Sequence, residues 1–356
     1  MDTARYAARR DRLRRLMHEE NIDALLVTLD ANRYYLSGFE LQDHQVNESS
    51  GCLLIGKDGN DWLCTDARYF DAAKRLWDEN HIFIYGTEAP AAIGKLARSE
   101  IRGTVGFEAG CMSVAFHTSF AEGLSLKASG GLVEKLRVIK EPEEIRLMEA
   151  SAALNHKLME WVPGILVPGK TEESLAWDIE RFFRENGAEA LSFPCITAVG
   201  PNAALPHATP GKDTLAENTC VLVDVGCRLH AYCSDQTRTF WVGRKPTDTF
   251  LRTIAQVRTA QEKAIAAIRP GIPACDIYAA ARTFLDSEGV GAFFTHGLGH
   301  GVGLQTHEAP SLNGRNQTRL APGMVVTVEP GLYYPEWGGV RWEYMVLVTE
   351  DGHRIL

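Results

Sequence analysis

The stretch His296-Gly297-Leu298-Gly299-His300-Gly301-Val302-Gly303-Leu304-Gln305-Thr306-His307-Glu308 holds three histidines and four glycines in thirteen residues. Glycine costs about 1 kcal/mol relative to alanine inside a helix, so alternating glycines make a helix unfavourable here. We therefore predict an extended strand, in which His296 and His300 point to the same side. The glycines would leave the opposite side bare, so that another backbone can approach closely. This pattern predicts a site whose partners lie elsewhere in the chain.

Four acidic residues are predicted to be those partners. Each stands within, or next to, a run of apolar and β-branched residues that predicts a buried strand. The four are Asp224 within 220–225, Asp235 before 236–242, Glu329 after 324–328 and Glu343 within 340–348. The first two runs would pair as a hairpin. Because a buried, unpaired carboxylate is unfavourable by several kcal/mol, these acids require cations, either an arginine such as Arg238 or metal ions.

Together with His300, the four acids form an oxygen-rich set of metal ligands. Such ligands suit divalent ions such as Mn²⁺, Co²⁺ or Fe²⁺, and four carboxylates carry enough charge for two ions that share bridging oxygens. For Asp224 or Asp235 alone, a salt bridge or a turn would explain the residue as well. The recurrence of the pattern at four positions favours a metal site.

The composition excludes several classes of function. The chain has 356 residues with 45% hydrophobic content, which is enough for two domains, and its formal charge of -9 is scattered without long runs of like charge. Neither a nucleic-acid-binding face nor a polybasic membrane patch is predicted. No apolar stretch approaches the roughly 18 residues that span a bilayer, and the N-terminal segment is charged, so we expect a cytoplasmic protein. The eight cysteines lack a CxxC pair and are expected to be reduced thiols.

Two domains are expected, covering residues 1–137 and 138–356. Strand and helix patterns alternate in the first, which predicts a small α/β domain. The boundary is placed before Pro142, which would begin a long helix over residues 143–161.

The second domain contains a repeat. Pro168-Gly169 precedes a predicted helix that ends at Gly187, and Pro270-Gly271 precedes one that ends at Gly289, 102 positions later. Apolar positions keep the same register, and a long helix is predicted before each unit. We therefore predict two helix-helix-strand halves whose strands meet in one sheet with its helices on one side.

In this order and in these local contexts, the five predicted ligands resemble those of the pita-bread metallopeptidases, the M24 family of methionine aminopeptidase, Xaa-Pro aminopeptidase and prolidase. Residues 1–137 look like the creatinase-type N-terminal domain of proline-specific members. Residues 138–356 look like the pseudo-symmetric catalytic domain. The resemblance implies an α/β (α+β) protein, whose catalytic domain has a curved, largely antiparallel sheet covered by helices.

The resemblance also implies roles for individual residues. Asp224 would bind one ion, Asp235 and Glu343 would bridge both, and His300 with Glu329 would complete the other. Two divalent ions are expected, with manganese ahead of cobalt, iron or zinc. A water between the ions would be the nucleophile, and the catalytic residues would be Glu329 as proton shuttle, His307 as oxyanion stabiliser, and His296. The substrate-binding residues would be His207 and His296 at the proline subsite, His307, Tyr333, which could also orient the site, and Arg341, which would also hold the bridging carboxylates.

An Xaa-Pro aminopeptidase, which removes the first residue from peptides with proline second, is the function we expect from the resemblance. Several prolidases carry an arginine after His-Glu-x-Pro that grips a dipeptide's carboxylate, whereas this chain has Ser311, although Arg315 could take that place. A second departure is the pair Trp342 and Tyr344 around Glu343, where the family often has an aliphatic residue and an aspartate. Relatives are commonly homodimers, and we expect one here.

Three alternatives are kept. The first is an Xaa-Pro dipeptidase, or prolidase. The second is a creatinase-like enzyme or a lyase on the same fold, and the third is a non-catalytic peptide-binding module. Creatinase-like members dispense with the metal ligands, and all five are present in this chain. The intact ligand set therefore favours a metal-dependent peptidase.

Overall fold

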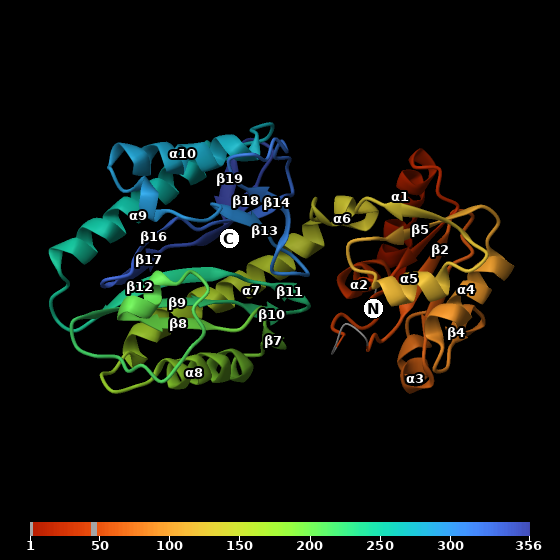
Figure 1. The fold of residues 1–356 in the computed structure, drawn as a ribbon, viewed down its shortest axis with the longest axis horizontal. Helices are drawn as coiled ribbons and strands as arrows, with labels where there is room; N and C mark the ends of the chain where they lie inside the picture. Colours follow the sequence, from red (N-terminus) through yellow and green to blue (C-terminus); the bar gives the residue numbers. More distant parts are fainter. Residues whose placement is uncertain (1–2, 44–47) are drawn as a thin grey trace. The chain divides into compact units, whose positions relative to one another are not determined.

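A computed structural model describes residues 3–43 and 48–356. The chain divides between Arg137 and Val138 into two compact units. Helices and strands of both units are labelled in Figure 1. Among the described residues, no helix is both long and apolar enough to cross a membrane. All eight cysteines are free, and six of them are buried.

The first unit is built around a six-stranded mixed sheet with the order β4-β3-β2-β1-β5-β6. Its central strand β1 pairs antiparallel with β2 and parallel with β5, and all four of its apolar residues are buried. A strand that is covered on both faces is expected to be apolar throughout. The strands are β1 (Ala24–Val27), β2 (Cys52–Gly56), β3 (Trp62–Thr65), β4 (Ile82–Ile84), β5 (Thr104–Glu108) and β6 (Ser125–Ser129). The helices are α1 (Thr3–Glu19), α2 (Asp30–Ser37), α3 (Phe70–Ala73), α4 (Ala89–Glu100), α5 (Val114–Phe120) and α6 (Leu132–Arg137).

Four long helices and thirteen short strands make up the second unit, and its described strand pairs are all antiparallel. In Figure 1, α9 and α10 run above the strands and α8 runs below them, while α7 slants down from α6 across the strands. The helices are α7 (Pro142–Trp161), α8 (Glu172–Glu185), α9 (Asp248–Ala267) and α10 (Ala274–Ser287). The first seven strands are β7 (Ala190–Leu191), β8 (Ile196–Val199), β9 (Thr219–Val225), β10 (Cys227–Leu229), β11 (Tyr232–Cys233), β12 (Gln236–Val242) and β13 (Gly299–Gly301). The others are β14 (Glu308–Leu312), β15 (Val325–Val328), β16 (Gly331–Tyr334), β17 (Gly338–Arg341), β18 (Tyr344–Val348) and β19 (His353–Ile355).

The predicted repeat is present. Helix α8 spans 172–185 and α10 spans 274–287, so both ends are displaced by the same 102 positions. The matched residues Phe183 and Leu285 are both fully buried. A twenty-residue helix precedes each of the two, α7 in the first half and α9 in the second. This duplication gives the α/β fold its pseudo-symmetric catalytic half.

The strands of this unit do not form the one continuous sheet that the sequence predicts. They fall into hydrogen-bonded sets such as β8-β9-β12 and β14-β13-β15-β18-β19. The ladders are interrupted where a site residue stands between two strands. Asp235 directly precedes β12, Glu329 lies between β15 and β16, and Glu343 lies between β17 and β18. Glu343 was predicted within one strand, and it instead occupies a break between two.

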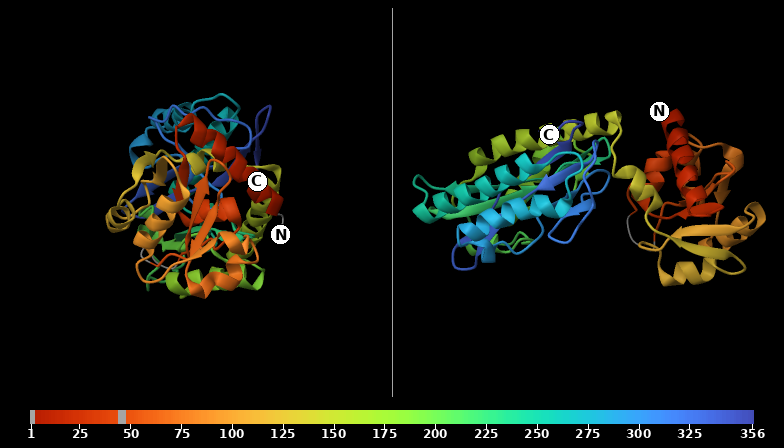
Figure 2. Two further views of the ribbon diagram at one scale, coloured as in Figure 1. Left: turned by 90° about the vertical axis from the view of Figure 1, so that its right-hand side faces the viewer. Right: turned by 90° about the horizontal axis from the view of Figure 1, so that it is seen from above.

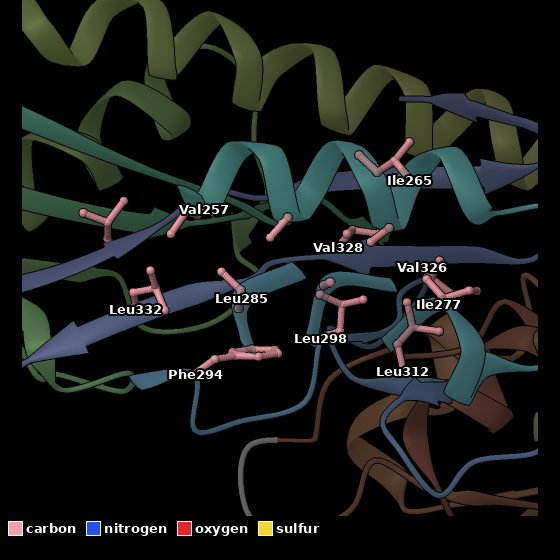
Figure 3. Packing of buried hydrophobic residues seen from close by; sticks show 14 of the residues in the cluster. Val257, Ile265, Ile277, Leu285, Phe294, Leu298, Leu312, Val326, Val328 and Leu332 are labelled. Atoms are coloured by element: carbon pink, nitrogen blue, oxygen red, sulfur yellow. The ribbon is translucent and has the colours of Figure 1, made fainter. Parts of the chain in front are cut away.

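Strand alternation directs the acids away from the apolar core. On β15, Val326 and Val328 belong to the large apolar cluster that also contains residues of α9 and α10, and Figure 3 shows both among these side chains. Because side chains alternate, Glu329 is expected to point to the face opposite Val328. The Glu329 carboxylate accordingly lies near the hydroxyl of Thr327, two residues earlier. Figure 2 shows the same unit from two further directions.

Candidate metal centre

Most of the predicted site residues converge on one cavity. The cavity has a volume of about 430 Å³ and lies within the second unit. All five predicted metal ligands line it. Of the site residues predicted from the sequence, those at the cavity wall are Asp224, Asp235, His300, Glu329, Glu343, His207, His296, His307 and Arg341.

Asp235, His300 and Glu343 form the most compact part of the site. Their potential ligand atoms all lie within 4.8 Å of one another. His300 Nε2 lies 3.6 Å from Asp235 Oδ2 and 3.5 Å from Glu329 Oε1. His300 Nδ1 contacts the carbonyl oxygen of Gly301 at 3.0 Å, which leaves Nε2 directed at the carboxylates. A nitrogen and several oxygens at this spacing can surround a divalent ion.

The charge balance of the site also fits metal ions. Burial raises the pKa of Glu329 to about 8. Burial, followed by repulsion from neighbouring carboxylates, raises the pKa of Asp235 and Glu343 well above the ordinary range. Burial lowers the pKa of His300 to about 4, so its imidazole is neutral near pH 7, as a metal ligand must be. Without cations the carboxylates cannot all be ionised together.

Asp224 supplies a further indication, because its Oδ1 is buried and has no hydrogen-bond partner among the described residues. A buried carboxylate oxygen without a partner is unfavourable, and a cation would satisfy it. The other oxygen, Oδ2, accepts a hydrogen bond of 2.6 Å from Arg341 Nη2. The donor set therefore fits two divalent ions held by Asp224, Asp235, His300, Glu329 and Glu343.

Arg341 holds a different carboxylate from the one expected. The sequence predicts contact with the bridging acids Asp235 and Glu343, but the ion pairs are with Asp224 at 2.6 Å and Glu329 at 4.0 Å. Arg341 Nε donates instead to the Thr237 hydroxyl at 3.1 Å, and that hydroxyl in turn donates to Glu343 Oε2 at 2.7 Å. The arginine therefore reaches Glu343 through a threonine. The reason is register, because Thr237 pairs directly with Asp224 across β12 and β9.

The three histidines of the opening stretch do face one space, although not from one strand. Only residues 299–301 form strand β13. His296 lies before it and His307 after it, and the rings of His300 and His307 have centroids 4.1 Å apart. Burial lowers the pKa of His296 to about 4, so this imidazole is also neutral near pH 7. His207 follows the short 3₁₀ helix η4 (Gly200–Ala204) and reaches the same cavity.

Gly299 and Gly301 allow another backbone to approach closely, as the sequence predicts. A Cβ on Gly299 would lie 2.0 Å from the carbonyl oxygen of Thr327, and one on Gly301 would lie 2.1 Å from that of Ala309. These two glycines admit neighbouring backbone of the protein itself. Gly297 and Gly299 both line the cavity, but a Cβ on Gly297 would lie 3.4 Å from its nearest neighbour, the carbonyl oxygen of Leu312, so among the three only Gly297 has room for a methyl group.

Tyr333 lies behind the cavity wall and not on it. Its hydroxyl lies 2.8 Å from His296 Nε2 and accepts a hydrogen bond of 2.9 Å from Arg341 Nη1. The residue is only 6% exposed, and it is absent from the cavity lining. Of the two roles expected for Tyr333, substrate binding and orientation of the site, the second is the one that its contacts fit. The geometry favours a residue that orients His296 and Arg341.

Sequence reasoning missed Thr237 and the apolar side of the cavity. Thr237 stands two positions after Asp235 in a predicted strand, so alternation could have placed it beside the site. The apolar wall includes Phe193, Pro194, Cys195 and Ile196. No local pattern marks these residues, because they meet the acids only through the tertiary fold. Arg315, the alternative partner for a dipeptide carboxylate, is exposed and does not line the cavity.

Comparison with known proteins points to one family. The profile of metallopeptidase family M24 matches residues 146–350, and that of the creatinase/prolidase N-terminal domain matches residues 9–139. An uncharacterized peptidase of Bacillus subtilis, YqhT, is 34% identical over 349 residues, which cover 97% of this chain and 96% of that protein. An Xaa-Pro dipeptidase from Bacillus anthracis is 32% identical with a TM-score of 0.91, covering 98% of this chain and 97% of the other. An X-Pro aminopeptidase from Thermotoga maritima is 29% identical with a TM-score of 0.83, covering 97% of each.

Proposed function

We propose that this chain, which belongs to metallopeptidase family M24 and carries a creatinase/prolidase N-terminal domain, is a metal-dependent Xaa-Pro aminopeptidase. It would release the first residue from peptides that have proline in second position. The observation that carries the proposal is the convergence of four carboxylates and a neutral histidine on one cavity. We include homodimer formation in the proposal, and light scattering on the purified protein tests it.

Asp224, Asp235, His300, Glu329 and Glu343 would hold two divalent ions, with manganese first and cobalt, iron or zinc as alternatives. Such ions supply Lewis acidity, which polarises a peptide carbonyl and lowers the pKa of water near neutral pH. The protein's own contribution is to fix these side chains before substrate arrives. Arg341 performs this for Asp224, and Thr237 performs it for Glu343.

Glu329 is proposed as the proton carrier. Its carboxylate lines the cavity and lies 3.5 Å from His300 Nε2. The carboxylate would take a proton from the attacking water and pass it to the proline nitrogen as the C–N bond breaks. A positioned acid–base group of this kind contributes roughly 10²- to 10⁴-fold to a rate. The reaction is balanced, because one water molecule is consumed and the products carry one new carboxyl terminus and one new amino terminus.

The histidines are proposed to contact the substrate. His307 stands beside His300 at the cavity wall, where it would donate to the developing oxyanion. His296 and His207 would border the proline ring. His296 is held by Tyr333, so its orientation is fixed from the side away from the cavity.

The cavity also supports an aminopeptidase over a dipeptidase. Arg341 is the one arginine among its described lining residues, and it is already paired with Asp224. A dipeptide would present its terminal carboxylate to this cavity, whereas a longer peptide presents a neutral amide. Because a buried carboxylate requires a cation, the longer peptide fits better. The similarity to the Bacillus anthracis Xaa-Pro dipeptidase keeps prolidase activity as the second candidate.

The test compares peptides of two lengths. The purified protein, loaded with Mn²⁺ or Co²⁺, should release the first residue from an Xaa-Pro-Xaa tripeptide. Turnover of the matching Xaa-Pro dipeptide should be much slower, and an Xaa-Ala-Xaa tripeptide serves as control for the proline requirement. A chelator should abolish the activity, and Glu329→Gln should lower kcat by about 10²-fold or more.

Two outcomes would contradict the proposal. Cleavage of dipeptides alone would make the protein a prolidase. Activity that survives complete removal of metal would overturn the assigned chemistry.

A further inference from the structure

Four side chains stack on one another next to Glu343. They come from β12, β18, α9 and the segment between β17 and β18. Arg238 of β12 lies at the centre, with its guanidinium carbon 4.4 Å from the Trp342 ring centroid and 4.2 Å from that of Tyr344. Arg258 of α9 lies 5.3 Å from the Trp342 ring. We call Arg238, Trp342, Tyr344 and Arg258 the Arg238 stack.

The position of the stack follows from the local sequence. Trp342 and Tyr344 flank Glu343, and alternate residues of an extended segment point to the same side. Both rings are therefore expected on the side opposite the Glu343 carboxylate, and both contact the same guanidinium.

Arg238 also fixes the backbone at Glu343. Its Nη1 donates to the Glu343 carbonyl oxygen at 2.6 Å and to that of Thr237 at 2.7 Å. Because Glu343 stands between β17 and β18, its backbone lies outside both strands. The Glu343 N–H donates to the carbonyl oxygen of Thr237 at 3.2 Å, which completes the connection to β12.

The geometry of the guanidinium suits this role. It is planar, so it can stack on aromatic rings and donate hydrogen bonds in its own plane at the same time. Arg238 is 7% exposed and Glu343 is 1% exposed, so water competes little for either group. A lysine could supply the charge, but it could not reproduce the flat contact with both rings.

We infer that the Arg238 stack is the device that positions Glu343 as a metal ligand. It holds the backbone of Glu343 from behind while Thr237 holds one carboxylate oxygen from the side. The carboxylate then faces Asp235 and His300 with little freedom to turn. The inference rests on the proposed metal-dependent function, and it assigns Arg238 as a positioning residue that does not itself touch metal or substrate.

The decisive measurement is metal affinity and not activity alone. Metal-free wild type and Arg238→Lys are each titrated with Mn²⁺ by calorimetry, and the visible absorption spectrum of each Co²⁺ form is recorded. Loss of a group that orients a metal ligand typically weakens metal binding by about 10- to 100-fold. We expect that loss for Arg238→Lys, together with an altered Co²⁺ spectrum.

A matched control removes a similar contact elsewhere. Lys263 of α9 lies 5.5 Å from the ring of Phe284, and neither residue lines the cavity. Lys263→Met should bind Mn²⁺ like wild type. Trp342→Leu and Tyr344→Leu each remove one ring, and each should weaken Mn²⁺ binding less than Arg238→Lys does. If Arg238→Lys does not fold, these two variants test the inference in its place.

The outcomes separate the inference from the proposed function. Wild-type Mn²⁺ affinity and an unchanged Co²⁺ spectrum in the folded stack variants would overturn the inference. A wild type that binds Mn²⁺ but cleaves no peptide would overturn the proposed function, while the affinities would still decide the role of the stack. A wild type that binds no divalent ion would contradict both the inference and the proposed function.

Discussion

Lys140 Nζ lies 3.2 Å from Glu308 Oε2, and the two side chains are only 1% and 6% exposed. Glu308 is the first residue of β14 and directly follows the loop that joins β13 to β14, whereas Lys140 lies between α6 and α7. Glu308 Oε1 accepts a hydrogen bond of 3.0 Å from the backbone N–H of Gln305 within that loop. His300 and His307 stand at the two ends of the loop, so the ion pair shapes the segment that carries both.

Replacing Lys140 with methionine should therefore destabilise the protein strongly. Glu308 would be left buried without its lysine, a change that typically costs about 3–5 kcal/mol. The double variant Lys140→Met/Glu308→Gln should recover much of this loss, because it removes both charges. Urea denaturation measures the free energy of unfolding of each. Lys170→Met is the control, since the Lys170–Asp178 pair is 16% and 17% exposed and should contribute about 1 kcal/mol or less. Equal losses in the two single variants would refute the argument.

The metal-free protein should become less stable as pH rises from 6.5 to 8. Burial raises the pKa of Glu329 from 4.5 to about 8, so the folded state holds a proton that the unfolded chain has released. The pKa values of Asp235 and Glu343 are raised in the same direction. Stability falls with pH wherever the folded state binds more protons. His296 and His300, with pKa values lowered from 6.5 to about 4, act oppositely but only below pH 6.5.

Metal should abolish this fall, because the ions replace the protons. Thermal denaturation of the metal-free and Mn²⁺-saturated protein between pH 6.5 and 8 measures the difference. Calorimetric titration at pH 7 in buffers of different ionisation enthalpy should show protons released on Mn²⁺ binding. A metal-free protein that gains stability over this interval would contradict the raised carboxyl pKa values.

The sequence allowed prediction of those features that a local pattern encodes. Acids within apolar runs identified Asp224, Asp235, Glu329 and Glu343, because strand patterns seldom contain carboxylates without a reason. The recurrence of Pro-Gly and Gly predicted α8 and α10 with matching ends. These signals are carried by residues close together in the chain, and they do not depend on knowing which strands meet.

The partners of those residues could not be predicted in the same way. Arg238 and Glu343 are 105 positions apart, and Lys140 and Glu308 are 168 apart. Such contacts are set by the order in which strands and helices pack, which periodicity does not encode. The break at Glu343 was missed for a related reason. The surrounding residues are all typical of strands, and only the contacts with Thr237 and Arg238 show where the ladder stops.

Removal of the Tyr333 hydroxyl should weaken substrate binding without removing metal ligands. Tyr333→Phe deletes an oxygen that contacts both His296 and Arg341, and an unsatisfied buried donor typically costs about 1–3 kcal/mol. With His296 less well oriented, KM for an Xaa-Pro-Xaa tripeptide should rise more than kcat falls. Tyr334→Phe is the control, since its ring packs on Phe293 and Trp337. A pure loss of kcat with unchanged KM would argue instead that Tyr333 acts through the metal site.

Gly297 and Gly299 should separate the structural role of the glycines from the substrate-facing one. A Cβ on Gly299 would meet the Thr327 carbonyl oxygen at 2.0 Å, so Gly299→Ala forces β13 and β15 apart and should cost about 1–3 kcal/mol in the free energy of unfolding. Gly297 has 3.4 Å of clearance and lines the cavity, so Gly297→Ala should leave stability within roughly 1 kcal/mol of wild type. The added methyl group should instead raise KM for the tripeptide. Urea denaturation and steady-state kinetics are measured on both variants. If each glycine has one role, Gly299→Ala lowers the free energy of unfolding and Gly297→Ala raises KM. If Gly299→Ala raised KM with stability unchanged, Gly299, which also lines the cavity, would have a role in substrate binding.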